Sequence, residues 1–235
     1  MSERVARALA AARLPAEVTD EDHGAWRLVR PEASAAPTAA RLQLDGTLPS
    51  AVLLRQDPCW ENVHLDGWAV VMEDGRRELL RHAPIWQTAH GCVLVTGLGM
   101  GCVVRGLLTI PEVTRVDVVE LDPWIVAKFG PTVEDPRVTV HTGDATTWTP
   151  PADRRYDWAW HDLWSPHNAE HHLQVTHLRM MVHFVDHMAA PGRQGAWAMP
   201  REIGRRAIPP LLGMPGRRRW FRGLGRDEYV QGAVL

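Results

Sequence analysis

The stretch CVLVTGLGMG, residues 92–101, decides the fold class of this chain. Cys92–Thr96 is a continuous apolar run, typical of a strand that is buried on both faces of a parallel sheet. Glycines follow at 97, 99 and 101, and the residues after them have helical spacing. Glycine lets the backbone turn sharply and approach a ligand, and a helix N-terminus offers free N–H groups. The stretch therefore predicts a strand, a ligand-binding turn and a helix.

Further along the chain, buried strands alternate with helical segments. The expected strands are Val116–Leu121 (VDVVEL), Arg137–His141 (RVTVH), Tyr156–His161 (YDWAWH) and a fifth at Gly195–Met199. Asp122-Pro123 is expected to begin the helix after the second strand, as N-cap and first helical residue. This alternation predicts an α/β fold with a Rossmann-like, doubly wound sheet.

Four regions are expected in all. Residues 83–200 form the Rossmann-like nucleoside-binding domain, and residues 41–82, with LDG and EDG turn signals, form a small N-terminal β unit. Residues 1–40 are expected to be an appendage, with a short helix capped by Ser2 and a Pro/Ala/Ser-rich linker. Residues 201–235 are an arginine-rich C-terminal segment.

Composition narrows the class of protein. The 235 residues are 45% hydrophobic and 23% charged, with a formal net charge of −2. That balance suits a globular domain and gives no global attraction for nucleic acid or anionic lipid. The first fourteen residues carry charges and no sustained apolar stretch, and the uncharged segment Pro84–Val104 is broken by glycines. We expect a cytoplasmic protein without a membrane span, its three cysteines reduced.

Carboxylates follow three of the predicted strands. Glu120 closes the second strand about 20 residues past the glycines, where a carboxylate can hold ribose hydroxyls. Asp144, in Gly143-Asp144-Ala145, follows the third strand, and Asp162 ends the fourth. Ligands of open α/β sheets bind outside the carboxyl ends of the strands, where these three carboxylates are expected. Together with the glycine turn, the carboxylates therefore predict a nucleoside site. Asp122 is explained by helix capping alone.

The motifs VLVTGLGMG, VDVVELD, VTVHTGDA and YDWAWHD together resemble the class I S-adenosylmethionine-dependent methyltransferases, and most of all their spermidine synthase-like branch. The resemblance covers roughly residues 60–166. It implies that S-adenosylmethionine is the cofactor and that its methionine and ribose lie against Gly97, Gly99 and Gly101. It further implies that Glu120 binds the ribose, that Asp144 with the Ala145 backbone reads the adenine, and that Asp162 faces the donor or an acceptor amine.

Two departures bear on the reaction. Spermidine synthases have an acidic residue where this chain has Met100, and a second aspartate where it has Ser165. Losing two carboxylates from a site for a polycationic amine argues against aminopropyl transfer. A methyltransferase acting on a small-molecule acceptor is therefore preferred, and a spermidine synthase-like aminopropyltransferase is the alternative.

The acceptor side is expected beyond the fourth strand. Methyl transfer from a sulfonium needs positioning and removal of an acceptor proton, for which Asp162 or His161 is the candidate catalytic base. Asp162 is favoured because strand alternation points the two side chains to opposite faces. Trp164, His167 and His171 are candidate residues of the acceptor pocket. Histidine pairs spaced by four residues lack a matching Glu or Cys, so no metal is expected.

Other classes of function stay open. A nicotinamide-dependent oxidoreductase is disfavoured because Cys102 stands where its fingerprint has glycine. A non-catalytic nucleoside- or RNA-binding relative would use the arginines and aromatics of residues 217–222, but so short a cluster does not favour nucleic acid. A homodimer is compatible with the sequence and not required by it.

Overall fold

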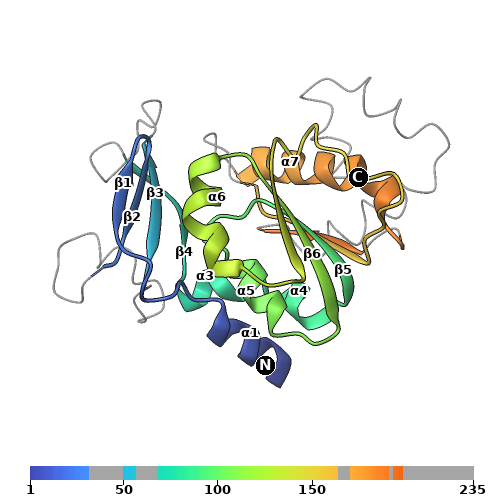
Figure 1. The fold of residues 1–235 in the computed structure, drawn as a ribbon, viewed down its shortest axis with the longest axis horizontal. Helices are drawn as coiled ribbons and strands as arrows, with labels where there is room; N and C mark the ends of the chain where they lie inside the picture. Colours follow the sequence, from blue (N-terminus) through green and yellow to red (C-terminus); the bar gives the residue numbers. More distant parts are fainter. Residues whose placement is uncertain (32–49, 57–67, 164–169, 191–192, 198–235) are drawn as a thin grey trace.

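The computed structural model describes residues 1–31, 50–56, 68–163, 170–190 and 193–197, without side chains for 170–175. Two sheets lie side by side in it, a small antiparallel one built from the N-terminal part and a larger parallel one (Figure 1). The predicted C-terminal segment, residues 201–235, lies outside the described residues.

The antiparallel sheet has the order β1-β2-β3-β4. Its strands are β1 (Glu21–His23), β2 (Trp26–Val29), β3 (Val52–Gln56) and β4 (Trp68–Glu73). The two later strands fall within the predicted β unit at 41–82, and helix α3 (Arg76–Leu80) completes that region.

The first 31 residues differ from the expected appendage, because they are integrated into the domain. Helix α1 (Glu3–Ala11) begins after Ser2, whose hydroxyl accepts from the Val5 N–H as predicted. The helix packs on α4 and α5 with Val5 and Ala8 buried, since its apolar residues share one face. Strands β1 and β2 then extend the antiparallel sheet, and the Trp26 indole donates to Asp122, 2.7 Å away.

The parallel sheet confirms the predicted fold class. Its five strands are β5 (Gly91–Thr96), β6 (Val113–Glu120), β7 (Val138–Thr142), β8 (Trp158–His161) and β9 (Gln194–Ala196). They pair in parallel in the order β7-β6-β5-β8-β9. The chain winds outward from β5 in one direction and then from β8 in the other. The sheet therefore has a switch point between these two strands, where ligands of such folds bind.

Helices cover both faces of the parallel sheet. On one face lie α4 (Ala83–Thr88), α5 (Cys102–Leu108) and α6 (Pro123–Phe129), followed by the short η1 (Gly130–Val133); on the other lie α7 (Glu170–His183) and η2 (Val185–His187). Val93 and Val95 of β5 join the first core cluster and Leu94 joins the second. No helix among the described residues is long and apolar enough to cross a membrane.

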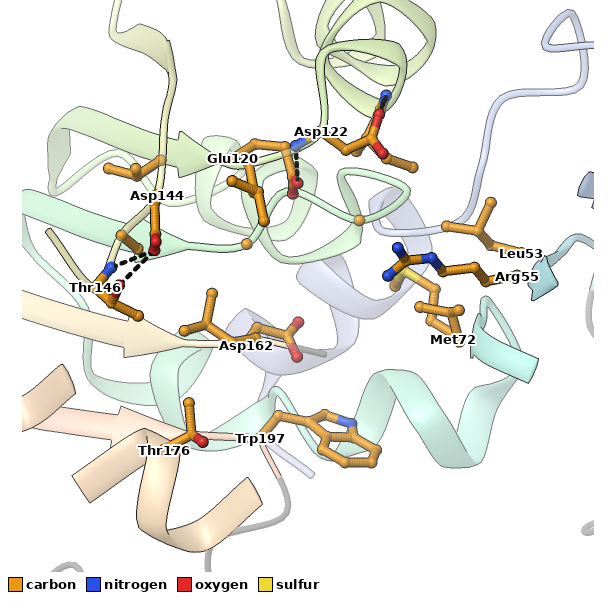
Figure 2. A pocket seen from close by; sticks show the side chains of 18 of the residues that line it. Leu53, Arg55, Met72, Glu120, Asp122, Asp144, Thr146, Asp162, Thr176 and Trp197 are labelled. Carbon is orange, nitrogen blue, oxygen red and sulfur yellow. Dashed lines mark hydrogen bonds between the residues drawn. The ribbon is translucent and has the colours of Figure 1, made fainter. Parts of the chain in front are cut away.

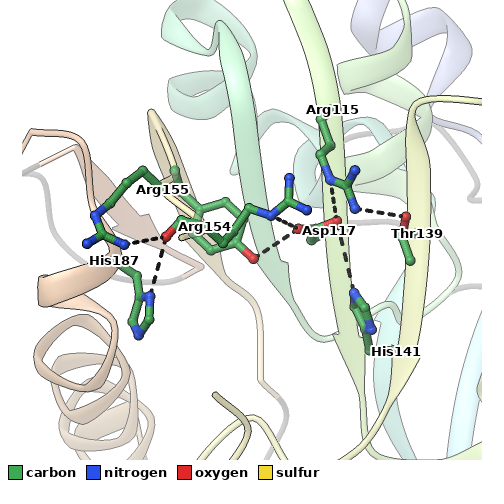
Figure 3. Close-up of polar contacts among 8 residues, drawn as sticks. Arg115, Asp117, Thr139, His141, Arg154, Arg155 and His187 are labelled. Carbon is green, nitrogen blue, oxygen red and sulfur yellow. Dashed lines mark hydrogen bonds and ion pairs between the residues drawn. The ribbon is translucent and has the colours of Figure 1, made fainter. Parts of the chain in front are cut away.

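One polar network is buried within the sheet. Asp117 of β6, with its side chain 2% exposed, accepts hydrogen bonds from Arg115 Nε at 2.9 Å and from the Tyr156 hydroxyl at 3.0 Å. The Arg154 Nε lies 3.6 Å away and the His141 Nε2 4.0 Å away (Figure 3). Cationic partners surround this carboxylate, which is how buried charges are accommodated in proteins.

Candidate functional site

A cavity of about 350 Å³ opens at the carboxyl edge of β5, β6 and β8, between the parallel sheet and the antiparallel sheet. Figure 2 shows Asp162 extending into this space, with Glu120 on one side and Trp197 on the other. The parallel sheet contributes the residues that follow its strands, and β3 and β4 contribute Leu53, Arg55 and Met72. The switch point of the sheet and the cavity thus coincide.

The glycine turn closes one wall of the cavity. Gly97 has φ +91°, and a Cβ there would overlap the Asp162 carbonyl oxygen, so only glycine fits. Gly97 and Gly99 line the cavity. Gly101 stands behind them as the left-handed N-cap of α5, and it is not among the lining residues. Met72 of β4 braces the turn, because its sulfur accepts from the Met100 N–H at 3.0 Å.

Glu120, the last residue of β6, is held rigidly at the cavity. One carboxylate oxygen accepts from the Leu98 N–H at 2.7 Å, and the other accepts from the Asp122 N–H at 2.9 Å. Each carboxylate oxygen has a second lone pair, so Glu120 can still accept two hydroxyl hydrogen bonds. Asp122 caps α6, as predicted, by accepting from the Trp124 N–H.

Asp144 and Ala145 follow β7 and line the same cavity. Asp144 is exposed, and its Oδ1 accepts from both the backbone N–H and the hydroxyl of Thr146, at 2.8 and 2.7 Å. Ala145 is 4% exposed and packs with Leu94 and Val119. This turn places the Asp144 carboxylate at the far end of the cavity from Arg55 (Figure 2).

The side chains of Asp162 and His161 point to opposite sides at the end of β8. Asp162 lines the cavity, whereas His161 is fully buried on the opposite face, between Thr96 and Gln194, each 3.0 Å from one of its ring nitrogens. Burial lowers the pKa of His161 to about 3. It raises the pKa of Asp162 to about 8, helped by the carboxylates of Glu78 and Glu120. Of the two candidate bases, only Asp162 can reach a ligand.

Two cavity residues escaped the sequence reasoning. Glu78 of α3 and Trp197, just after β9, face each other, and the Trp197 indole donates to the Glu78 carboxylate. Arg81 lies 3.5 Å from that carboxylate and stacks over the Trp197 ring. Burial raises the pKa of Glu78 above its usual value. Glu78 falls in the run RRELL at 76–80, within the expected β unit, and its local pattern does not mark it as a cavity residue.

The remaining predicted residues take no part in what the structure describes of the cavity. Trp164 and His167 lie outside the described residues; His171 is in α7, but its side chain is not described.

The histidine pair His183 and His187, spaced by four residues, makes other contacts: each ring donates to a backbone carbonyl, of Trp148 and Arg154 respectively. Within the described ranges, no three His, Cys, Asp or Glu side chains are grouped as metal ligands.

Comparison with known proteins gives partial matches. No family model matches the chain. A polyamine aminopropyltransferase from Corynebacterium efficiens is 38% identical over 86 residues, which are 32% of this chain and 16% of that protein. The chain thus matches only a small part of the length of this curated relative.

Solved structures with a similar fold include three methyltransferases. The glycopeptide N-methyltransferase MtfA, complexed with S-adenosyl-L-methionine, is 20% identical with a TM-score of 0.36, over 46% of this chain and 44% of that chain. The amino pentose methyltransferase CalS10 from Micromonospora echinaspora is 23% identical with a TM-score of 0.34, over 52% and 49%. The CcbJ methyltransferase from Streptomyces caelestis is 21% identical with a TM-score of 0.35, over 49% and 45%.

Proposed function

We propose that this chain is an S-adenosylmethionine-dependent methyltransferase that acts on a small molecule. The observation that carries the proposal is the placement of Gly97, Glu120, Asp144 and Asp162 around one cavity at the switch point of a parallel sheet. Each lies at the carboxyl end of a different strand, so the fold itself brings them together. A glycine turn with a carboxylate on the next strand suits a nucleoside.

The proposed donor fits the chemistry of this lining. Glu120 is fixed by two backbone N–H groups and can accept from both ribose hydroxyls. In this proposal Asp144 and Ala145 would meet the adenine of the donor, and the glycine turn would meet its methionine. S-adenosylmethionine supplies a methyl group already activated by the sulfonium, so the protein has mainly to position the reactants.

Asp162 is the proposed base. It extends toward the middle of the cavity, where it can take the proton that an amine or hydroxyl acceptor loses. Without a ligand, its raised pKa keeps the carboxyl protonated at neutral pH. A cationic donor favours the ionised form of a nearby carboxylate, so donor binding would prepare the base.

The test is formation of S-adenosylhomocysteine when the purified protein is incubated with S-adenosylmethionine and pools of small amines, alcohols and phenols. We expect product with at least one pool, and its loss in Asp162→Asn. The exposed Asp153→Asn variant is the matched control and should retain turnover. If the intact protein forms no S-adenosylhomocysteine with any pool and does not bind the donor, the proposal is wrong.

A second candidate, aminopropyl transfer, is favoured by one structural observation. Glu78 adds a carboxylate to the cavity near Asp162. It partly compensates for the two acidic residues that spermidine synthases have at the positions of Met100 and Ser165. Two carboxylates with raised pKa values can accommodate a cationic amine. Aminopropyl transfer from decarboxylated S-adenosylmethionine to putrescine would release methylthioadenosine. If this product forms and S-adenosylhomocysteine does not, the second candidate replaces the first.

A further inference from the structure

His82 is a buried histidine whose ring has no hydrogen-bonding partner in the described part of the chain. It lies between α3 and α4, with 0% of its side chain exposed. Its ring packs against those of Trp86 and Trp160, with ring centroids 5.7 and 5.9 Å apart, and the contact with Trp160 is edge-on. Neither ring nitrogen has a partner among the described residues. Leaving buried polar atoms unpaired is costly, so such a group calls for a functional explanation.

The polar group that faces this ring is Asp162. Its Oδ2 lies 4.0 Å from His82 Nε2, just beyond hydrogen-bonding distance. Within the described part of the chain, no hydrogen bond to the Asp162 carboxylate is made. A movement of about 1 Å would bring the two side chains into a hydrogen bond. His82 thus stands directly behind the proposed base, on the side away from solvent.

The surrounding charges decide which protonation states the pair adopts. Glu78 and Arg81 of α3, Glu120 of β6 and the Cys102 thiol of α5 are the titratable groups that act on the pair, and α4 carries none. Burial, and then Arg81, lowers the pKa of His82 to about 3, so its imidazole is neutral at physiological pH. A neutral imidazole carries one N–H and can donate it from Nε2.

We propose that His82 is a positioning residue for Asp162. When a cationic donor occupies the cavity, the neutral ring donates its Nε2–H to the Asp162 carboxylate and holds that carboxylate in place. The inference rests on the proposed function, because a donor with positive charge is what brings Asp162 to its ionised form. A hydrogen bond to the ionised form stabilises it, and the His82 ring, which has no partner among the described residues, lies close enough to supply one after a small shift.

Two ligands that differ in charge test this role. S-adenosylmethionine and S-adenosylhomocysteine are titrated calorimetrically from pH 6 to pH 9 into the intact protein, His82→Phe and His82→Gln. Phenylalanine keeps a ring between the two tryptophans but has no donor, whereas glutamine can place an amide N–H near the position of Nε2. In the intact protein, affinity for the sulfonium ligand should rise with pH as Asp162 ionises, while affinity for the neutral thioether changes little.

His82→Phe should move the midpoint of this rise up by about one pH unit, the size expected for one lost hydrogen bond to a charged group. His82→Gln should restore it, and neither variant should alter binding of S-adenosylhomocysteine much. If His82→Phe lowers only the melting temperature and leaves the midpoint unchanged, His82 is merely structural and the inference is wrong. If the intact protein binds neither ligand, the proposed function itself fails.

A measurement on the intact protein covers the case in which the variants do not fold. The 15N resonances of the His82 ring report which nitrogen carries the proton. With S-adenosylmethionine bound, we expect the Nε2-protonated neutral tautomer and a protected N–H. A ring protonated on Nδ1, or an imidazolium, in the bound state would overturn the inference.

Discussion

Two carboxylates of the parallel sheet, Asp117 and Asp162, have opposite electrostatic surroundings. Asp117, in the middle of β6, is surrounded by Arg115, Arg154 and the Tyr156 hydroxyl (Figure 3). Asp162, after β8, has the carboxylates of Glu78 and Glu120 as its charged neighbours, and the Nε2 of His82 lies 4.0 Å away, beyond hydrogen-bonding distance. The first carboxylate has cationic and hydroxyl partners, whereas the charged neighbours of the second are themselves carboxylates.

The comparison separates structural from functional carboxylates on physical grounds. A buried acid with cationic and hydroxyl partners needs nothing more from a ligand. A half-buried acid whose neighbours are also acids is unfavourable as an anion until a cation enters, and such groups gather at functional sites. We therefore expect substitutions at the two positions to have different effects, on stability in one case and on ligand binding in the other.

The largest expected effect is at Asp117. Asp117→Asn should lower the free energy of unfolding by about 3 kcal/mol, because Arg115 and Arg154 would lose the charge that balances them in a mostly buried network. Urea unfolding at pH 7, followed by tryptophan fluorescence, measures the loss. Asp162→Asn is the comparison and should cause no loss at pH 7, because asparagine removes a carboxyl whose ionisation is unfavourable in the folded protein. Equal losses would remove the distinction between the two acids.

A second prediction concerns pH. Burial and the nearby carboxylates of Glu78 and Glu120 raise the pKa of Asp162 from its ordinary value of 3.8 to about 8, so the folded state holds a proton that the unfolded state has released. Between these values, this group makes the free energy of unfolding fall as pH rises, by at most about 1.4 kcal/mol per pH unit. The stability that it contributes is complete below about pH 4 and is lost as pH rises through 8.

The measurement is the difference in free energy of unfolding between the intact protein and Asp162→Asn at several pH values, without ligand. Taking the difference removes the contributions of the buried histidines, which are common to both proteins. The free energy of unfolding of the intact protein is expected to fall steadily relative to that of Asp162→Asn from pH 5 to pH 8, because asparagine does not titrate. Two parallel curves would mean that Asp162 is ionised throughout, as a structural carboxylate would be.

The smallest effect is expected at Glu78, which lies between the two extremes because Trp197 and Arg81 partly satisfy it. Trp197→Phe removes the indole donor and should lower the free energy of unfolding by about 1 kcal/mol, the usual value for one hydrogen bond. Trp124→Phe is the matched control, since its indole donates to Glu21, whose side chain is 40% exposed. Thermal unfolding of both variants gives the comparison. If Trp197→Phe and Trp124→Phe lower the free energy of unfolding equally, the hydrogen bond to the more buried Glu78 contributes no more than the one to the exposed Glu21.

The sequence predicted the parallel sheet well because its signals are local. The apolar run at 92–96 and the glycines after it specify a buried strand and a turn on their own. Asp122-Pro123 specified a helix start, and alternation along β8 separated His161 from Asp162. Each of these predictions depends on neighbouring residues in the chain, and the structure agrees with each of them.

What the sequence could not reveal depends on contacts between distant segments. Glu78 and Trp197 are 119 residues apart, and their pairing follows only from how α3 and β9 approach the same cavity. The approach of His82 to Asp162 has the same origin. Strands β1 and β2 escaped prediction because they are short and gain stability only by joining the sheet, where β1 pairs with β2 and β2 pairs with β3.

The most direct test of the central claim, that this cavity binds a nucleoside through Glu120, is a calorimetric titration with S-adenosylmethionine. We expect saturable one-site binding to the intact protein, weakened about 100-fold in Glu120→Gln because hydrogen bonds of two ribose hydroxyls to a charged acceptor are impaired. Glu112→Gln, at an exposed position with its side chain 61% accessible, should bind as the intact protein does. No binding by the intact protein, or equal binding by Glu120→Gln, would contradict the account.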